Sequence, residues 1–294
     1  TFFSASNPGI LMGGMFGESK FDVLCKVPDE VKPKTIRIDY PVTRDEIVAS
    51  LRQHGMTFPL IFKPDLGERG WLVRKIESEE DIDPYLQSIN FAFITQAFVD
   101  LPLEFGVFYV RYPGEERGRV VSIVGKEMLA VTGDGRHTFR ELILAKDRAR
   151  LQWKTLQIAY RHRLEEVLPT SEVVELVSIG NHCLGTKFLD ANYLITEGLT
   201  VSFDRISKRI EGFYFGRFDL RAASTEALEQ GNVMIMELNG CGAEPSHIYQ
   251  PGFPLARAMR VLFRHWRDIY EVSRQNHQRG IAYISFSEAR RIYK

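Results

Sequence analysis

Short apolar runs, bounded by glycine, proline and polar residues, dominate the hydrophobic pattern of this 294-residue chain. Several are rich in aromatic and β-branched residues, which is typical of strands whose side chains alternate between the faces of a sheet. We therefore predict strands at about 59–63, 71–76, 91–99, 105–112, 119–131, 211–221 and 232–239.

Capping residues indicate helices between these strands. Thr43 and Glu46 have the spacing of a capping box, and Ser78 precedes three acidic residues that suit the first turn of a helix. We predict helices over about 43–55, 78–89, 138–167 and 254–275, the last opened by Pro254.

Hairpins mixed with helices, without regular βαβ alternation, favour an α+β fold. At 294 residues the chain is long enough for one large domain or two modest ones. We place a soft boundary between a first lobe, at about 40–100, and a second lobe that follows it.

Charge and composition limit the classes of partner that the sequence indicates. The 38 basic and 38 acidic residues balance, so no overall field indicates a nucleic-acid or membrane partner. No apolar run approaches the ~20 residues of a membrane-spanning helix, and no signal peptide is visible. The three cysteines are widely spaced and odd in number, which is typical of reduced thiols. We expect a cytoplasmic protein, and because the sequence opens at Thr1 without Met, we expect that a segment precedes it.

The last two predicted strands carry the clearest chemistry. Arg217 and Asp219 share a strand face, and so do Glu237 and Asn239. If the two strands pair, three oxygen ligands converge beside a guanidinium group. Carboxylate and amide oxygens suit magnesium, which also uses substrate phosphates. A solvated, salt-bridged face is the alternative.

A second candidate site lies at Lys63, which ends an apolar strand before a loop containing Gly67, Arg69 and Gly70. A lysine beside a flexible glycine loop suits phosphate binding. A plain hairpin with a snorkelling lysine is the alternative. The P-loop, the dinucleotide fingerprint and the kinase catalytic loop are all missing, so a nucleotide would need a different cradle.

These segments resemble the ATP-grasp enzymes. Residues 58–70 are similar to that family's lysine strand and glycine flap, and 95–99 with Glu104 to its adenine hinge and ribose acid. Residues 216–221 and 237–240 resemble its magnesium strands. The pattern is most similar to D-alanine–D-alanine ligase-like carboxylate–amine ligases, over roughly 18–254. The resemblance implies two α+β lobes clasping ATP, with residues 1–40 as a remnant of an N-terminal domain, 41–100 as the small lobe and 101–294 as the large lobe.

The resemblance also implies roles for individual residues. Lys20 and Lys63 would contact the ATP phosphates. Gly67, Arg69 and Gly70 would form the mobile flap. Adenine would lie near Gln96 and Val99, although an acid is common in this family where Gln96 stands, and Glu104 would bind ribose. Asp219, Glu237 and Asn239 would hold two magnesium ions, or manganese in their place. Arg217 and Lys63 would be catalytic, with Arg217 stabilising an acyl phosphate and the tetrahedral intermediate.

Four further residues have no assigned role: His137, His182, Lys187 and His247. His137 follows a Gly-Asp-Gly turn that a helix start explains. His182 and Lys187 lie in a segment that either binds an anion or forms a surface turn. We expect His247 near the site, where the family positions the acceptor substrate.

The implied reaction is ATP-dependent formation of an amide or peptide bond from a small-molecule carboxylate and an amine, with amino acids among the candidates. Two alternatives remain open: an ATP-grasp kinase acting on a hydroxyl group, and a nucleotide-binding protein without turnover. We expect no nucleic-acid or membrane partner, and a homodimer is one option.

Overall fold

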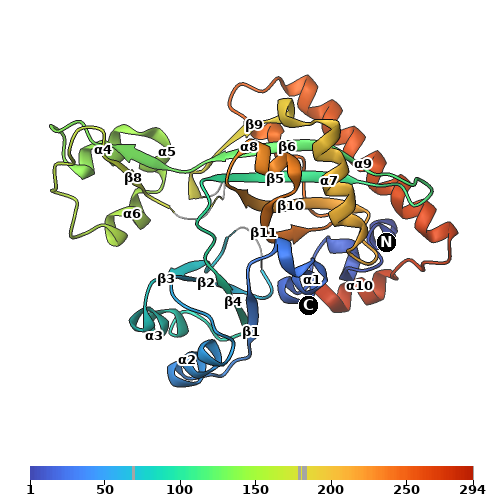
Figure 1. The fold of residues 1–294 in the computed structure, drawn as a ribbon, viewed down its shortest axis with the longest axis horizontal. Coiled ribbons are helices and arrows are strands. Elements are labelled where there is room, and N and C mark those ends of the chain that lie inside the picture. Colours follow the sequence, from blue (N-terminus) through green and yellow to red (C-terminus); the bar gives the residue numbers. More distant parts are fainter. Residues whose placement is uncertain (68–69, 178–179, 181–183, 294) are drawn as a thin grey trace. The chain divides into compact units, whose positions relative to one another are not determined.

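The computed structural model describes residues 1–67, 70–177, 180 and 184–293. The chain divides into two compact units, one formed by residues 1–125 and 189–294 and the other by residues 126–188. Both mix helices with sheets, so the α+β class predicted from the sequence is confirmed (Figure 1). In the described parts of the chain, no helix combines the length and apolarity that crossing a membrane requires.

The first unit contains a four-stranded sheet near the start of the chain. Its strands, in spatial order, are β1 (Thr35–Ile38), β4 (Phe93–Ala97), β2 (Leu60–Pro64) and β3 (Arg74–Ile76). α2 (Arg44–Gln53) and α3 (Ile82–Leu86) share one apolar core with these strands, through residues such as Ile47, Phe62 and Tyr85. Because side chains alternate along a strand, Lys63 points away from the core that holds Phe62.

A five-stranded sheet forms the centre of the first unit. Its order is β11 (Val233–Asn239), β10 (Phe215–Ala222), β5 (Leu103–Val110), β6 (Arg119–Glu127) and β9 (Lys187–Asp190). α7 (Glu197–Lys208) covers one face, where Phe203 meets Phe218. α9 (Leu255–Gln278) covers the other face, where Ile269 packs near Phe108 and Phe215 (Figure 1). Shorter helices of this unit are α1 (Lys20–Lys26), α8 (Thr225–Gln230) and α10 (Phe286–Tyr293).

The second unit, residues 126–188, has its own small core. It contains β7 (Ala130–Thr132), β8 (Val173–Glu175), α4 (Phe139–Ala145), α5 (Asp147–Leu151) and α6 (Trp153–Ala159). The strand predicted over 119–131 is therefore two strands: β6 belongs to the five-stranded sheet, whereas β7 pairs only with β8.

Several predicted elements are shorter than expected. The helices predicted over 138–167 are three short ones that end at Ala159, and the strand predicted from 211 begins at Phe215. The strand predicted from Trp71 begins at Arg74, because Leu72 adopts a left-handed φ of 52° that interrupts extended backbone. The helix predicted over 78–89 is a 3-10 turn, Glu79–Asp81, followed by α3. Pro84 lacks the N–H that would continue the helical bonding back to Glu80. The capping box at Thr43 is present as predicted, and α2 ends at Gln53.

Asp204, on α7, fixes the connection between β5 and β6. Its Oδ1 accepts hydrogen bonds from Tyr109 Oη at 2.7 Å and from the Gly118 backbone N at 2.8 Å. A Cβ atom on Gly118 would stand 2.1 Å from Tyr109 Oη, and the Tyr109 side chain is completely buried. The close packing at this corner of the sheet therefore requires glycine.

Gly118→Ala is expected to lower the free energy of unfolding by about 2 kcal/mol or more, since Tyr109 must move from a filled core. Gly114→Ala in the same connection is the matched control, because its Cβ would have no neighbour nearer than 3.5 Å. Denaturant unfolding followed by circular dichroism measures both. Equal stability of the two variants would contradict the packing argument.

Candidate active site

Charged residues on β10 and β11 lie together on one face of the five-stranded sheet. The two strands pair antiparallel, with Asp219 directly opposite Glu237. In the same register, Arg217 lies opposite Asn239. Directly opposed residues project from the same face, so the structure brings together the four residues whose convergence the strand pattern predicts.

A β-bulge sets this register. Asp219 pairs with Glu237, but the next residue, Leu220, pairs with Ile235, which leaves Met236 as an extra residue on β11. The Met236 carbonyl oxygen accepts hydrogen bonds from Lys63 Nζ at 3.1 Å and from Gln96 Nε2 at 3.3 Å. The bulge therefore brings the end of β2 to the carboxylate pair.

The Asp219 carboxylate is buried and held from two sides. Asn239 Nδ2 donates to Oδ2 at 2.8 Å, and Arg217 Nη2 donates to the same atom at 2.9 Å. The other arm of Arg217 donates to Ser246 Oγ at 2.8 Å and to the Glu244 carbonyl at 3.1 Å. Burial disfavours the Arg217 charge, but the carboxylates of Asp219, Glu237 and Glu244 together more than offset this, so the guanidinium pKa is raised. The guanidinium is thus charged and fixed in orientation.

Gly106, on β5, allows this pair to lie close to the strand beneath it. It lies opposite Asp219 in the β5–β10 register. A Cβ there would be 3.0 Å from Arg217 Cδ and 3.2 Å from Asp219 Oδ1. In the described residues no three His, Cys, Asp or Glu side chains form a metal-binding group. The candidate set consists of two carboxylates and one amide.

Lys63 is almost completely buried, 7% exposed, at the end of β2. Its Nζ donates to Gln96 Oε1 at 3.1 Å as well as to the Met236 carbonyl. Burial lowers the Lys63 pKa, and Glu237 partly counteracts this by attracting the ammonium. A lysine held at this cost lies where an anion would stabilise it.

The loop after Lys63 is tied to the start of α1. Asp65 Oδ1 accepts from Ser19 Oγ at 2.8 Å and from the Phe21 backbone N at 2.9 Å. Lys20 Nζ donates to the Gly67 carbonyl. Lys20 and Gly67 therefore lie together, and Gly67 and Gly70 both have positive φ, at 133° and 71°. Arg69, predicted as part of the flap, lies outside the described residues.

The predicted nucleotide-hinge residues take part in protein contacts. Gln96 is buried and uses its Nε2 to donate to Thr35 Oγ1 at 3.0 Å. Glu104 forms a buried salt bridge with Arg221 Nε at 3.0 Å, and Arg221 Nη1 donates to the Val99 carbonyl at 3.0 Å. Val99 and Glu104 are thus joined through Arg221.

The histidines predicted without a role divide into two groups. His247 follows Ser246, whose hydroxyl group accepts a hydrogen bond from Arg217. It is buried, and its Nδ1 lies 2.6 Å from Ser122 Oγ. Burial lowers its pKa, so it is neutral at pH 7. His137 is exposed and pairs with Asp134 at 2.5 Å in the turn before the capping residue Thr138. Lys187 forms an exposed ion pair with Glu127, and His182 lies outside the described residues.

Three features of the site are not in the predicted set. Gly106 and Ser246 carry no signal beyond a glycine in a strand and a serine in a loop. Arg221 does carry one, since it follows Asp219 at a spacing of two on the same face. Its partner Glu104 is 117 positions away, so the pairing needs the tertiary structure.

No protein-family model matches the sequence, and a search of curated proteins finds no match. Among solved structures, the chain is similar to a D-alanine–D-alanine ligase from Bacillus anthracis, with a TM-score of 0.49, 12% identity, and coverage of 92% of this chain and 72% of that one. It is also similar to a bifunctional glutathione synthetase from Pasteurella multocida, with a TM-score of 0.41, 14% identity, and coverage of 85% of this chain. The chain spans 36% of that synthetase. The functional proposal therefore depends on this chain's own residues.

Lys63→Met is expected to unfold at a higher temperature than the wild type at pH 7, because it removes a buried charge. The unfolded lysine pKa is about 10.4, and the folded pKa is lower, so between the two the unfolded state binds more protons. The free energy of unfolding of the wild type should therefore rise with pH through that window and approach that of the Lys63→Met variant. Melts from pH 7 to 10, with exposed Lys34→Met as control, measure the difference. Lower stability of Lys63→Met at every pH would indicate a structural ion pair instead.

Proposed function

We propose that this chain is an ATP-grasp, magnesium-dependent ligase that activates a small-molecule carboxylate as an acyl phosphate and joins it to an amine. One observation carries the proposal. The buried Lys63 ammonium reaches the carbonyl of Met236, next to Glu237, so a desolvated cation and two opposed carboxylates share one place. The ammonium group would complement the negative triphosphate, and the two carboxylates would complement the magnesium ion that accompanies it.

The residues present fit a magnesium ion. Asp219, Glu237 and Asn239 offer hard oxygen donors on one face, and the absence of a side chain at Gly106 lets Asp219 and Arg217 lie close to β5. A magnesium ion held there would neutralise charge on the phosphates. In this proposal Lys63 and Lys20 contact phosphate oxygens.

The nucleotide base and ribose would lie near Gln96, Val99 and Glu104. The Gln96 side chain is hydrogen-bonded to Lys63 and Thr35. It would therefore contribute to nucleotide binding indirectly, by fixing the position of Lys63. Gly67, Arg69 and Gly70 would form the flap over the phosphates.

Arg217 performs the step that distinguishes a ligase. Attack of a carboxylate on a phosphate, and of an amine on the acyl phosphate, both concentrate negative charge on oxygen. Asp219 and Ser246 hold the Arg217 guanidinium in a fixed orientation, so no reorganisation is needed as that charge develops. In the first step the carboxylate oxygen bonds to the γ-phosphorus and ADP leaves; in the second the amine nitrogen bonds to the acyl carbon, loses a proton and expels inorganic phosphate.

The lobes of the ATP-grasp fold belong to the same proposal. A small lobe at 41–100 is supported by the four-stranded sheet, whose β1 extends it back to Thr35. A large lobe at 101–294 is supported by the five-stranded sheet that carries the carboxylates. Residues 1–40 would then be the remnant of an N-terminal domain.

Asp219→Asn and Glu237→Gln are each expected to weaken ATP binding in magnesium by about tenfold or more, since the metal loses a charged ligand. ATP binding in EDTA should change little. Calorimetric titrations with and without magnesium provide the measurement. Exposed Glu226→Gln, on the α8 connection between the two strands, is the control. Unchanged magnesium dependence in both variants would remove the metal assignment.

Arg217→Lys is expected to slow turnover about a hundredfold while leaving ATP affinity nearly unchanged, because the lost interaction belongs to the transition state. Phosphate release is measured with ATP, magnesium and a library of amino acids. With hydroxylamine as the amine, a hydroxamate should form. A phosphorylated hydroxyl product formed without any amine would assign the chain to the kinases. Failure of the wild type to bind ATP would overturn the whole proposal.

A further inference from the structure

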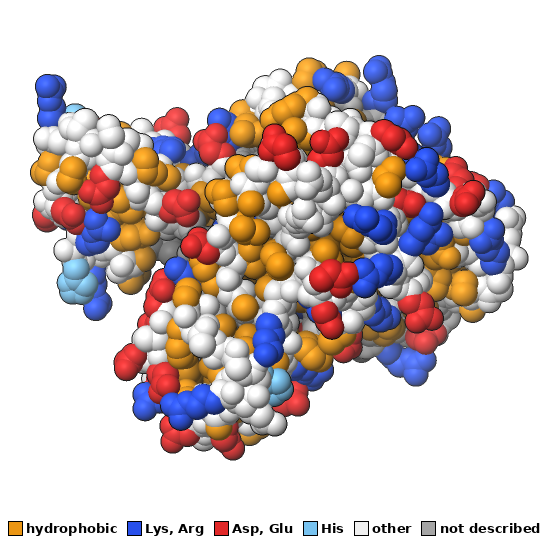
Figure 2. Space-filling model, viewed as in Figure 1, with side chains coloured by type: hydrophobic (Ala, Val, Ile, Leu, Met, Phe, Trp, Pro, Cys, Tyr) orange, Lys and Arg blue, Asp and Glu red, His pale blue; other side chains and the backbone are white. Residues whose placement is uncertain are grey.

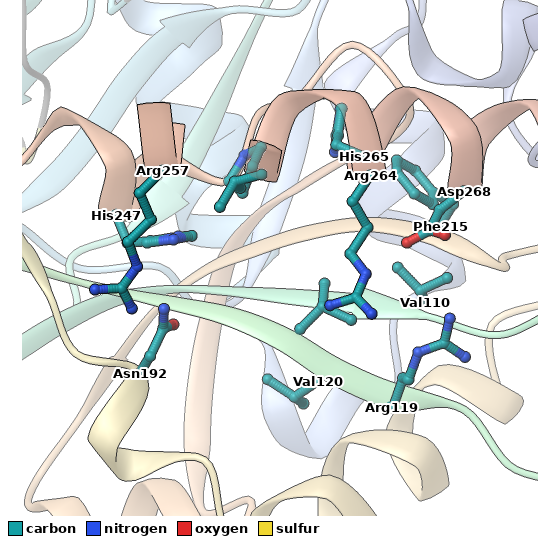
Figure 3. A pocket seen from close by; sticks show the side chains of 13 residues that line it. Val110, Arg119, Val120, Asn192, Phe215, His247, Arg257, Arg264, His265 and Asp268 are labelled. Atoms are coloured by element: carbon teal, nitrogen blue, oxygen red, sulfur yellow. The ribbon is translucent and has the colours of Figure 1, made fainter. Parts of the chain in front are cut away.

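A cavity of about 410 Å³ lies beneath α9, on the sheet face that carries Arg217 and Asp219. Its walls come from β5, β6 and β10, from the segment around His247, and from α9. The polar residues that line it include Arg119, Asn192, His247, Arg257, Arg264 and Asp268 (Figure 3). All of them belong to the first unit.

The α9 residues of the cavity form one stripe. Arg257, Val261, Arg264 and Asp268 follow each other at spacings of four, three and four, so they share the helix face that looks into the cavity. Such a stripe normally carries apolar residues. Figure 3 shows Arg257 and Arg264 reaching from the helix into the space below it, and Arg119 rising from β6 toward Arg264.

Positive charge predominates in this cavity. Three guanidinium groups face one carboxylate, Asp268, which is buried and already accepts a hydrogen bond from Tyr112 Oη at 2.6 Å. The two lining histidines do not add charge at pH 7, because burial lowers the pKa of His265 to about 4 and also lowers that of His247. Elsewhere acidic and basic side chains are interspersed over the surface in view (Figure 2).

The two helix arginines have no acidic partner in the described parts of the chain. Arg257 stacks over Phe253, with its guanidinium carbon 5.2 Å from the ring centroid. Arg264 also lacks a salt bridge there. Arg119, by contrast, is paired with Glu115 at 3.3 Å and lies over Tyr112. Two exposed guanidinium groups at the rim of a cavity are thus available to a ligand.

The cavity is joined to the candidate active site by three consecutive residues. Ser246 Oγ accepts from Arg217, while Pro245 and His247, on either side of it, line the cavity. His247 is fixed by Ser122 Oγ at 2.6 Å. A ligand in the cavity would therefore contact the same loop that orients Arg217.

We propose that this cavity binds an oxyanion, a carboxylate or phosphate group, at the non-reacting end of one of the ligase's substrates. Guanidinium groups recognise both anions through paired, charge-assisted hydrogen bonds. Asn192 supplies a further polar side chain beside Arg257 (Figure 3). The substrate is thus an acid or amine that carries an additional anionic group beyond the bond being made. This inference rests on the proposed function.

The test uses the full chain without nucleotide and two probes, inorganic phosphate and succinate. Each is titrated calorimetrically at an ionic strength held constant with sodium chloride, because exposed charges are screened by salt. Arg257→Gln/Arg264→Gln is compared with Arg260→Gln/Arg267→Gln, which removes two exposed arginines of α9 that do not line the cavity. ATP–magnesium binding is measured for all three proteins.

At least one probe should bind the wild type saturably, and the Arg257/Arg264 variant should lose about tenfold or more in affinity. The control variant should bind as the wild type does. Preference for phosphate or for succinate identifies the group. Absence of saturable binding of either probe, or binding of both probes with unchanged affinity in the Arg257/Arg264 variant, would overturn the inference. If the cavity inference fails but the wild type still binds ATP–magnesium, the proposed function stands. If the wild type does not bind ATP–magnesium, the proposed function fails as well.

Discussion

The register of β10 against β11 is the constraint on which the candidate site depends. Asp219 faces Glu237 only because Met236 is an extra residue between the paired positions of β11. A strand that slipped by one residue would turn its side chains to the opposite face. The carboxylates would then enter the core beneath α7, next to Phe218 and Leu220. The apolar residues that pack there therefore hold the charged residues in place.

Much of the polar structure around this register serves to hold charges that burial disfavours. Arg217 is fixed by a carboxylate, a carbonyl and a hydroxyl group, and Lys63 by an amide and a carbonyl. Removing the Asp219 partner would leave the Arg217 charge buried and unpaired, which costs more than the bond itself contributes. The Arg217 guanidinium is consequently held in one orientation.

The sequence predicted well what depends on local alternation. The two strands, their shared face and the capping box at Thr43 all follow from spacing alone. The sequence also contains a signal for α7: Thr196 is a helix cap, and Leu199, Phe203 and Ile206 follow it at helical spacing. Helix α9 was predicted, but not that the face it turns to the cavity contains Arg257 and Arg264.

Features that depend on distant contacts could not be predicted. The bulge at Met236 has no mark in the sequence, because it arises from how β10 and β11 pair. The salt bridge of Glu104 to Arg221 joins residues on different strands of the sheet. The helix predicted after Ser78 fails for a local reason that could have been recognised, since Pro84 stands within it. Functional roles, finally, depend on ligands that the sequence pattern does not contain.

The α8 connection joins β10 to β11 at the end of the hairpin away from Arg217 and Asn239. Asp219 and Glu237 are therefore contributed by two chain segments that meet only through strand pairing. New termini introduced between Thr225 and Gln230 would leave each carboxylate on a separate side of the cut. By the same geometry, a longer or shorter connection would leave Asp219 opposite Glu237, whereas an insertion or deletion between Met236 and Asn239 would shift the register that opposes them.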